Sequence, residues 1–337
     1  MSYKAAFTFA DGKTLFCPVA EKESVLDAAL KNGIRLPFDC REGVCATCKG
    51  TCESGKYSQE YVDDDALNAH DLENGKVLTC QTHLHSDATF SFNFASTVCA
   101  ENQGICDGVV SEIQHISPTT AILKIVPESA SIPEYLPGQY ARLNIPGTNS
   151  TRAYSFASWP EGDSLAFLIR ILPDGVMSHY IRQIGKPGDR MQIEAPYGTF
   201  YLRDIRRPVV MMAGGTGLSA FLAMLDKLAL SQCDYPIHLI YGVRSEEDIC
   251  ELERLIGYQS HLPAFCFTIV LSAPGPDWQG KTGYITDNVT LTDVYQEGFD
   301  LYVCGPPPMV DAVNLWVTQQ PYPEITVYCE KFINSNN

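Results

Sequence analysis

The sequence predicts a multidomain protein of the α+β and α/β classes, with a small domain that carries a cysteine loop, an antiparallel β-barrel and a doubly wound parallel sheet. Three observations predict this order. The chain has 337 residues, 45% of them hydrophobic, which is enough for two or three cores. Short strand-like runs broken by turn residues fill its middle. From Arg207 onward, apolar strands alternate with helical stretches, as in a parallel sheet with helices on both faces.

The first domain is expected to cover residues 1–98. It opens with two strand-like runs, YKAAFTF and TLFCPV, separated by the turn ADGK. A short amphipathic helix follows, SVLDAALKNG, with Ser24 as its N-cap and Gly33 at its end. The cysteine loop comes next. Residues 101–108, ENQGICDG, are expected to form the linker to the second domain.

The second domain is expected over residues 107–205 and the third over residues 206–337. The barrel strands expected in the second are TAILKIVP, QYARLNIP, RAYSFAS, LAFLIRIL and DRMQIEA. The third begins with the strand PVVMMA, the turn GGTG and the helix LSAFLAMLDKLALS. Its further strands are IHLIYGV, AFCFTIVLS, DLYVCG and ITVYCEKF, and the helical stretches between them indicate parallel connections.

Composition excludes several functional classes. The net charge of -16 argues against nucleic-acid binding, which calls for a basic face. The N-terminus MSYKAAFTFADG does not have the pattern of a signal peptide, and no apolar run approaches the ~18 residues of a membrane span. The 13 cysteines are scattered, so they are expected to be reduced thiols or metal ligands in a protein of the cytoplasm.

Three cysteines lie in the segment CREGVCATCKG. Cys40, Cys45 and Cys48 have the spacing C-x4-C-x2-C, and Cys80 follows 32 residues later. This is the plant-type spacing of a [2Fe–2S] cluster, in which three ligands from one tight loop and a fourth from elsewhere converge on two irons. Small residues between the ligands allow backbone N–H groups to point at the sulfurs, which helps to set the reduction potential.

The alternative at this loop is a zinc site made of Cys45, Cys48, Cys80 and His83, which leaves Cys40 unexplained. Cys52 is expected to be a buried thiol and not a ligand. The same interpretation as core thiols applies to the cysteines that have no spacing partner, Cys17, Cys99, Cys106, Cys233, Cys250 and Cys266.

The motif RAYS, with PGQY before it and GVMS and APYGTF after it, resembles the ferredoxin–NAD(P) reductase family over residues 107–337. The resemblance implies that Arg152 pairs with the flavin pyrophosphate, that Tyr154 lies against the isoalloxazine and that Ser155 approaches its N5. A guanidinium suits phosphate and an aromatic face suits a flat ring. Gly175 and Ser178 match the turn that holds a second phosphate, which implies FAD and not FMN.

The segment AGGTGLSAF follows a strand and opens a helix, where glycines let N–H groups approach a pyrophosphate. With YGVR and CGPPPM downstream it matches the same family, which implies that Cys304 lies beside the nicotinamide. The nicotinamide-binding residues expected here are Gly214, Gly215, Thr216, Gly217, Arg244, Gly305 and Pro306. Phe332, next to Glu330, matches the aromatic that covers the flavin, although Ile333–Asn337 extend past it.

The N-terminal domain resembles plant-type ferredoxins over residues 1–96, which implies a β-grasp fold. The whole order resembles the benzoate/toluate/anthranilate 1,2-dioxygenase reductase group. This implies a ferredoxin–NAD(+) reductase activity that passes electrons from NADH through FAD and the [2Fe–2S] cluster to a terminal Rieske oxygenase. Reductases of soluble methane or phenol monooxygenases are the alternative, and a flavin-containing redox sensor is a further one. Hydride transfer to flavin demands no general acid or base from the chain.

NADH is expected to be preferred over NADPH. Sites that accept a 2′-phosphate usually offer Arg or Lys. After the strand FTIVLS, Ser272 is followed by Ala273, and Asp277 adds a negative charge. Arg244 could supply the missing guanidinium, but we expect it to form an ion pair with one of the acids just downstream, Glu246, Glu247 or Asp248.

Overall fold

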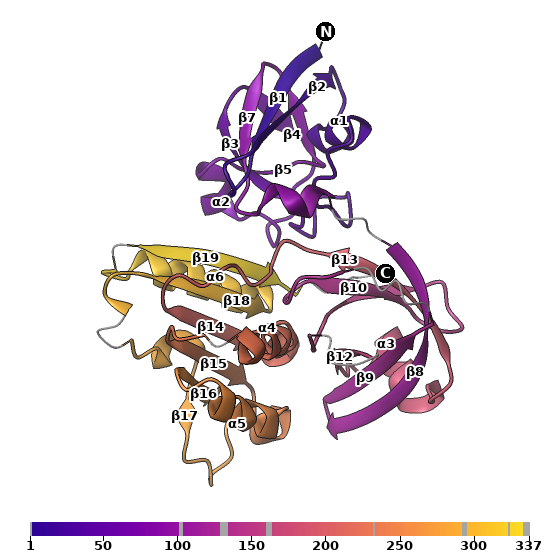
Figure 1. The fold of residues 1–337 in the computed structure, drawn as a ribbon, viewed down its shortest axis with the longest axis vertical. Coiled ribbons are helices and arrows are strands. Elements are labelled where there is room, and N and C mark those ends of the chain that lie inside the picture. Colours follow the sequence, from indigo (N-terminus) through magenta and orange to yellow (C-terminus); the bar gives the residue numbers. More distant parts are fainter. Residues whose placement is uncertain are drawn as a thin grey trace. The chain divides into compact units, whose positions relative to one another are not determined.

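The computed structural model describes residues 2–100, 104–128, 134–159, 164–231, 233–291, 295–322 and 324–332. The chain forms two compact units (Figure 1). The first unit contains Met1–Gln103 with Tyr197–Thr199, and the second contains Gly104–Pro196 and Phe200–Asn337. No helix among these residues is long and apolar enough to cross a membrane.

The first unit has a five-stranded sheet in the order β2-β1-β7-β3-β5. Its strands are β1 (Ser2–Thr8), β2 (Thr14–Ala20), β3 (Lys49–Ser54), β5 (Lys76–Leu78) and β7 (Ala88–Ser91). The hairpin β1–β2 is antiparallel, whereas β1 pairs in parallel with β7. A second, two-stranded sheet joins β4 (Tyr57–Gln59) to β6 (Thr82–Leu84). This arrangement confirms the β-grasp prediction.

Helix α1 (Val25–Lys31) begins where the sequence predicts. The side chain of Ser24 accepts a hydrogen bond from the backbone N–H of Asp27 at 3.0 Å, which caps the helix. Its buried face is Val25, Leu26, Ala28 and Ala29. The remaining helical segments of the unit are α2 (Ala69–Glu73) and the 3-10 turn η1 (Ser96–Ala100).

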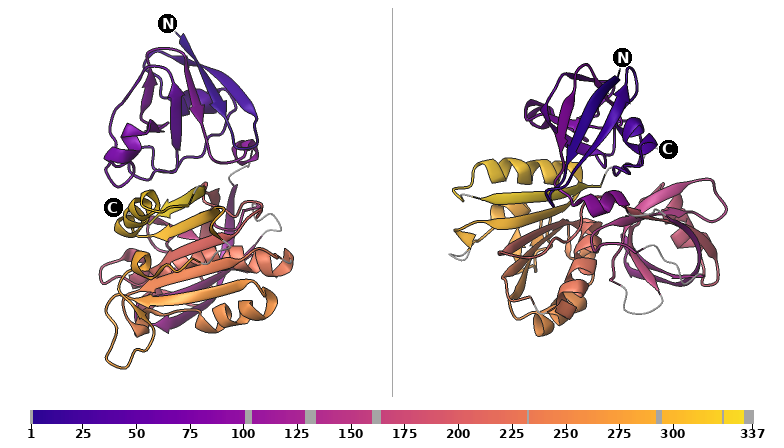
Figure 2. Two further views of the ribbon diagram at one scale, coloured as in Figure 1. Left: turned by 90° about the vertical axis from the view of Figure 1, so that its left-hand side faces the viewer. Right: turned by 45° about the horizontal axis from the view of Figure 1, so that its top comes forward.

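The second unit begins with a six-stranded antiparallel sheet in the order β11-β10-β13-β8-β9-β12 (Figure 2). Its elements are β8 (Gly104–Ser117), β9 (Thr120–Pro127), β10 (Tyr140–Asn144), β11 (Thr151–Ser155), β12 (Leu165–Arg170), α3 (Val176–His179), η2 (Tyr180–Ile184) and β13 (Arg190–Tyr197). The sheet curls around an apolar core but is not closed, because among the described residues its edge strands β11 and β12 meet in an isolated bridge, between Phe156 and Phe167, and not in a continuous ladder. The predicted barrel is therefore an open one.

The linker prediction is wrong in its second half. Strand β8 already begins at Gly104, and Cys106 pairs with Ile193 of β13. The alternating burial of β8 explains this, because Cys106, Gly108 and Val110 are directed toward the barrel core on every second position. Residues 101–103 lie outside the described residues.

The rest of the second unit, which the resemblance predicts to bind a nicotinamide nucleotide and which is called the nicotinamide half below, has six parallel strands in the order β17-β16-β15-β14-β18-β19. Its elements are β14 (Val209–Gly214), η3 (Gly215–Gly217), α4 (Leu218–Ser231), β15 (Ile237–Val243), η4 (Glu246–Asp248), α5 (Leu252–His261), β16 (Phe265–Leu271), β17 (Lys281–Thr282), η5 (Ile285–Asn288), β18 (Phe299–Gly305), α6 (Pro307–Thr318) and β19 (Ile325–Lys331). Helices α4 and α5 contribute to one core and α6 to the other, so both faces of the sheet are covered. The doubly wound prediction is confirmed.

The order of strands reverses between β14 and β18. From β14 the chain continues outward to β15, and it later returns to the other side of β14 as β18. The carboxyl ends of these two strands therefore lie at the topological switch point of the sheet, which is where open α/β sheets bind their ligands.

Candidate functional site

The loop that carries three cysteines folds around their sulfurs. Arg41, Gly43 and Ala46 all adopt left-handed backbone conformations, with φ of 62°, 81° and 57°. Such alternation turns successive N–H groups inward. The N–H of Glu42 lies 3.3 Å from the Cys40 Sγ, and the N–H of Cys40 lies 3.5 Å from the sulfur of the next cysteine along. A side chain at Gly43 would collide with the backbone oxygen of Tyr61, so only glycine fits there.

The four cysteines are arranged as two pairs. The thiol of Cys45, followed by backbone N–H groups of the loop, lowers the pKa of Cys40 to about 5. The thiol of Cys48 in the same way lowers the pKa of Cys80 to about 7. In the described part of the chain, no three Cys, His, Asp or Glu side chains are placed to hold one metal ion. Two pairs of sulfurs fit two irons with two protein ligands each, which is the donor set of a [2Fe–2S] cluster.

The zinc alternative requires His83, and the structure gives this residue another contact. Its Nε2 lies 3.2 Å from a carboxylate oxygen of Glu60. Cys52 lies on β3, where its thiol donates to the backbone oxygen of Ser54 at 3.3 Å. Cys52 is half-buried and not buried as predicted.

Two further predicted core thiols are also more exposed than expected. Cys266 is exposed on β16, and Cys233 is half-buried after α4. A spacing argument says only that these cysteines lack partners, and carries no information on which face of an element they occupy. The remaining unpartnered cysteines, Cys17, Cys99, Cys106 and Cys250, are buried.

Gln81 is a neighbour of the cysteine loop that the spacing argument missed. Its side-chain amide donates to the backbone oxygen of Arg41 at 3.0 Å and lies 3.7 Å from the Cys80 sulfur. Its Oε1 accepts the N–H of Tyr61 at 3.2 Å. The residue directly after the fourth cysteine thus ties that cysteine to the loop. The signal available in the sequence was that Gln81 directly follows Cys80, the fourth predicted ligand.

The residues predicted to hold the flavin lie on β11, an edge strand of the barrel. Arg152 is half-buried and donates to the backbone oxygen of Thr151 at 2.8 Å. Tyr154 packs its ring against the barrel core, and burial raises the pKa of its hydroxyl. Ser155 is buried, and its hydroxyl donates to a carboxylate oxygen of Glu330 on β19 at 3.4 Å.

Gly175 and Ser178 form one tight turn. A Cβ at Gly175 would lie 2.8 Å from the Ser178 Oγ, and that oxygen accepts the N–H of Leu172 at 2.8 Å. The turn opens helix α3, whose first N–H groups have no partner within the helix. A phosphate is the kind of group that such a turn accepts.

The glycines of the third domain let two strand ends approach each other. A side chain at Gly217 would collide with the backbone oxygen of Cys304, and a Cβ at Gly214 would lie 2.5 Å from the Met309 sulfur. A Cβ at Gly305 would lie 2.7 Å from the Met309 Cε. Gly215 has a φ of 56°, a left-handed conformation that suits glycine, and Thr216 lies beside it in the turn η3.

Cys304 ends up fully buried beside this glycine turn. It pairs with Ala213 on β14, and burial raises the pKa of its thiol well above the usual range. Pro306 caps helix α6, and the N–H of Phe332 donates to the backbone oxygen of Gly305 at 2.8 Å. Residues 333–337, which follow Phe332, lie outside the described residues.

The expected ion pair of Arg244 is absent from the described interactions. Glu246 instead accepts the backbone N–H of Gly275 at 3.0 and 3.1 Å, and Asp248 accepts from Ser245 and Thr119. Arg244 is exposed at the carboxyl end of β15. Two of the three acids, Glu246 and Asp248, are therefore held by other hydrogen-bond donors.

Arg170 is a second residue that the sequence reasoning missed. It ends β12 of the barrel, and its Nη1 lies 3.8 Å from where a Cβ on Gly215 would stand. A cation therefore reaches the glycine turn from the barrel side. The signal was a basic residue at the end of a barrel strand, in LAFLIRIL, shortly before the GVMS motif.

Three family models match the chain in succession. They are the 2Fe-2S iron-sulfur cluster binding domain over residues 8–85, the oxidoreductase FAD-binding domain over residues 107–201 and the oxidoreductase NAD-binding domain over residues 211–314. The chain is 47% identical to the anthranilate 1,2-dioxygenase electron transfer component of Acinetobacter baylyi, over 100% of this chain and 99% of that one. It belongs to the family of aromatic-ring 1,2-dioxygenase electron transfer components.

A second member, the toluate 1,2-dioxygenase electron transfer component of Pseudomonas putida, is 40% identical over 99% of this chain and 100% of its own. Among solved structures, the Amycolatopsis cytochrome P450 reductase GcoB aligns with a TM-score of 0.72 at 26% identity, covering 98% of this chain and 99% of that one. These findings confirm the predicted family and its three cofactors, a [2Fe–2S] cluster, FAD and NAD(H).

Proposed function

We propose that this electron transfer component is the reductase of a benzoate-type 1,2-dioxygenase and that it delivers electrons from NADH to a terminal Rieske oxygenase. The observation that carries the proposal is the 47% identity to an anthranilate 1,2-dioxygenase component over the full chain. The direction of transfer is favourable, since plant-type clusters lie near roughly -400 mV and Rieske centres between about -150 and +300 mV. The abundance of free thiols favours a reducing compartment, the cytoplasm.

Bound FAD supplies the conversion between a two-electron donor and a one-electron acceptor. The chain's own residues bind the flavin and orient it. Arg152 is proposed to pair with the flavin pyrophosphate, while Gly175 and Ser178 hold the second phosphate. Tyr154 offers its ring to the isoalloxazine, and Ser155 offers its hydroxyl near N5.

Cys304 is proposed to border the nicotinamide, at the carboxyl end of β18. The turn Gly214–Gly217, with Gly305 and Pro306, is proposed to receive the nucleotide, and Arg170 adds a cation beside that turn. Phe332 is proposed to be the aromatic near the flavin, and its backbone N–H is bonded to Gly305 at the end of β18. Arg244 is proposed to lie near the adenosine.

The cluster ligands are proposed to be Cys40, Cys45, Cys48 and Cys80. The pairing of their sulfurs supports this set, and Gln81 is proposed to hydrogen-bond to the last of them. Hydrogen bonds to ligand sulfurs favour the reduced, more negative cluster. The domains that carry the three cofactors are proposed over residues 1–98, 107–205 and 206–337.

The second candidate is a reductase of a monooxygenase. The chain is 32% identical to the propane 2-monooxygenase reductase component of Mycolicibacterium smegmatis, over 93% of both chains, and less similar to it than to the dioxygenase components. The test is reconstitution with a purified benzoate-type oxygenase and, separately, a phenol-type hydroxylase, each with its own substrate. Faster NADH-dependent product formation with the hydroxylase would overturn the proposal. Reduction by NADH without turnover in either would indicate a redox sensor.

NADH is predicted to be used about ten- to a hundredfold better than NADPH in kcat/KM with ferricyanide, the equivalent of a missing charged contact of about 1.5–3 kcal/mol. Ala273 and Asp277 are exposed beside the strand end, and the N–H of Gly275 is already occupied by the Glu246 carboxylate. A 2′-phosphate would meet negative charge in this loop.

Ala273→Arg should narrow the gap, whereas Ala273→Gln, similar in length but uncharged, should not. Equal efficiencies in the wild type would refute the preference. In that case Arg244→Ala would show whether Arg244 supplies the phosphate contact.

A further inference from the structure

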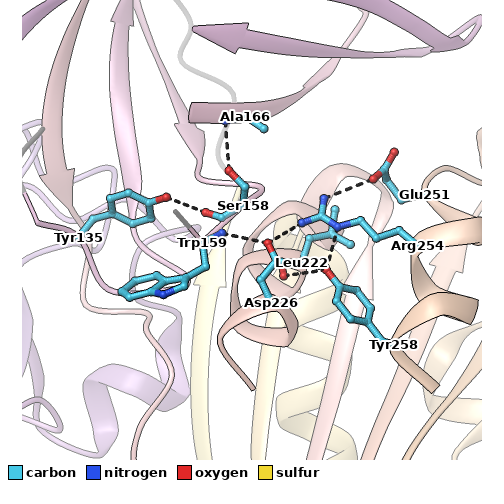
Figure 3. A network of polar contacts seen from close by, with 9 residues as sticks. All are labelled: Tyr135, Ser158, Trp159, Ala166, Leu222, Asp226, Glu251, Arg254 and Tyr258. Atoms are coloured by element: carbon cyan, nitrogen blue, oxygen red, sulfur yellow. Dashed lines mark hydrogen bonds and ion pairs between the residues drawn. The ribbon is translucent and has the colours of Figure 1, made fainter. Parts of the chain in front are cut away.

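A polar bridge joins the barrel to the nicotinamide half within the second unit (Figure 3). The backbone N–H of Trp159, which follows the barrel strand β11, donates to the Oδ2 of Asp226 on α4 at 2.9 Å. Neither residue belongs to the flavin or nicotinamide motifs. The contact therefore connects the barrel to helix α4, which begins directly after the glycine turn Gly215–Gly217.

Asp226 is held from its own domain as well. Arg254 on α5 approaches the same Oδ2 with its Nη2 at 2.6 Å, and the hydroxyl of Tyr258 donates to the Oδ1 at 2.5 Å. The Nε of Arg254 donates to the Tyr258 oxygen at 2.8 Å, and its Nη1 lies 3.3 Å from Glu251. The carboxylate that receives the barrel's N–H therefore cannot rotate freely.

The backbone supports the same interpretation. Glu251 stands at the N-cap position of α5 with a φ of 56°, a left-handed conformation that residues other than glycine rarely adopt. Its carboxylate is the one that lies 3.3 Å from the Arg254 Nη1. A strained residue that orients a charged network is typical of a functional constraint.

The barrel side of the bridge is fixed too. The hydroxyl of Tyr135 donates to the backbone oxygen of Ser158 at 2.7 Å, and its ring meets the Trp159 indole edge-on at 5.6 Å. The Oγ of Ser158 accepts the N–H of Ala166 on β12 at 3.3 Å. From the other half, Lys227 on α4 places its ammonium 4.9 Å from the centre of the indole ring, a second contact across the bridge. The N–H that crosses to Asp226 is thus held by the barrel.

A cavity of about 290 Å³ flanks the bridge, lined from the barrel side by Lys124, Ser158, Trp159, Ser164 and Ala166 and from the other side by Asp226 and Arg254. Away from this cavity the two halves also share an apolar core, in which the ring of Phe200 meets that of Phe221 on α4 edge-on at 5.9 Å. At the cavity itself the halves are joined by the hydrogen bond between Trp159 and Asp226, a polar contact. Other hydrogen bonds among the described residues also cross between the halves. Examples are those from Thr119 to Asp248 at 2.7 Å, from Ser155 to Glu330 at 3.4 Å and from the N–H of Arg203 to the Tyr302 hydroxyl at 3.0 Å.

We infer that Asp226 is a positioning residue for hydride transfer: it holds the nicotinamide half at the angle at which the bound nucleotide meets the flavin. The inference rests on the proposed function. Hydride transfer requires the reacting atoms about 3–3.5 Å apart, and a misplacement of about 1 Å can cost about a hundredfold in rate. The hydrogen bond from the Trp159 N–H to the Asp226 carboxylate supplies that precision, because its donor is held by the barrel and its acceptor by α5.

The test compares Asp226→Ala with Asp234→Ala, a matched loss of an exposed aspartate from the same domain, in the full chain loaded with FAD. Hydrogen exchange resolved at the Trp159 amide should become at least about tenfold faster in Asp226→Ala only. The limiting rate of flavin reduction by NADH should also fall at least about tenfold, with the Kd for NADH unchanged. Asp226→Asn keeps the shape of the side chain but loses its charge. It should raise the exchange rate of the Trp159 amide and lower the limiting rate of flavin reduction, both by less than Asp226→Ala does.

An unchanged exchange rate in Asp226→Ala would overturn the contact, and faster exchange with a wild-type rate of flavin reduction would overturn the positioning role. A weaker Kd for NADH with an unchanged limiting rate would make Asp226 a nucleotide-binding residue and also overturn it. Should Asp226→Ala fail to fold, the same outcomes apply to Asp226→Asn. Failure of the proposed function would differ from all of these, because the wild type itself would then not support the oxygenase.

Discussion

Cys45→Ser is expected to abolish the [2Fe–2S] cluster and all electron delivery to the oxygenase, whereas Cys52→Ser keeps both. Cys45 is paired with Cys40, and a cluster held by three thiolates and one weak hydroxyl ligand loses half of one iron's protein donors. Cys52 lies on β3 and donates to the backbone of Ser54, away from the loop. Both substitutions replace a cysteine sulfur by a serine oxygen, so Cys52→Ser is the matched control for Cys45→Ser.

Iron and acid-labile sulfide in the purified variants provide the measurement. We expect two irons and two sulfides per chain in Cys52→Ser, as in the wild type, and neither in Cys45→Ser. FAD should remain in both variants, since the residues proposed to bind the flavin lie in the other unit. A full cluster in Cys45→Ser, or one equivalent of zinc without sulfide in the wild type, would contradict the ligand set.

A chain that begins at Gly104 is expected to keep FAD and to oxidise NADH with ferricyanide at nearly the wild-type rate, yet to lose oxygenase turnover. The second unit starts at this residue, where β8 begins, and it contains its own apolar cores. Ferricyanide takes electrons directly from reduced flavin. The oxygenase is proposed to take them from the cluster, which the shortened chain lacks.

Adding the separate first unit back should restore only a small part of the turnover, because covalent linkage supplies an effective concentration that two free pieces do not have. Turnover of the oxygenase by the shortened chain alone would place the cluster outside the electron path. Loss of FAD from the shortened chain would instead show that the second unit does not fold by itself.

Features that depend on residues close in sequence were predictable. The cysteine spacing, the Ser24 cap and the glycine turn before α4 are set within a few residues of chain. The parallel sheet was predictable too, because its strands read as continuous apolar runs, as in β14.

Features that depend on tertiary contacts were not predictable. Asp226 and Trp159 are 67 residues apart, and nothing in either segment indicates that a backbone N–H meets that carboxylate. The predicted ion pair of Arg244 failed for a related reason, since Glu246 is held by Gly275, a residue 29 positions away. Neighbourhood in sequence is a poor guide to which donor a carboxylate finds.

The central claim is that electrons from NADH reach the cluster only through FAD, and it is tested most directly by adding NADH anaerobically to protein stripped of FAD. Electron paramagnetic resonance detects the reduced cluster, which is paramagnetic. The account predicts that the cluster stays oxidised in the stripped protein and becomes reduced within the same sample once FAD is restored. Reduction of the cluster by NADH without FAD, or its failure to be reduced in the FAD-loaded protein, would contradict the account.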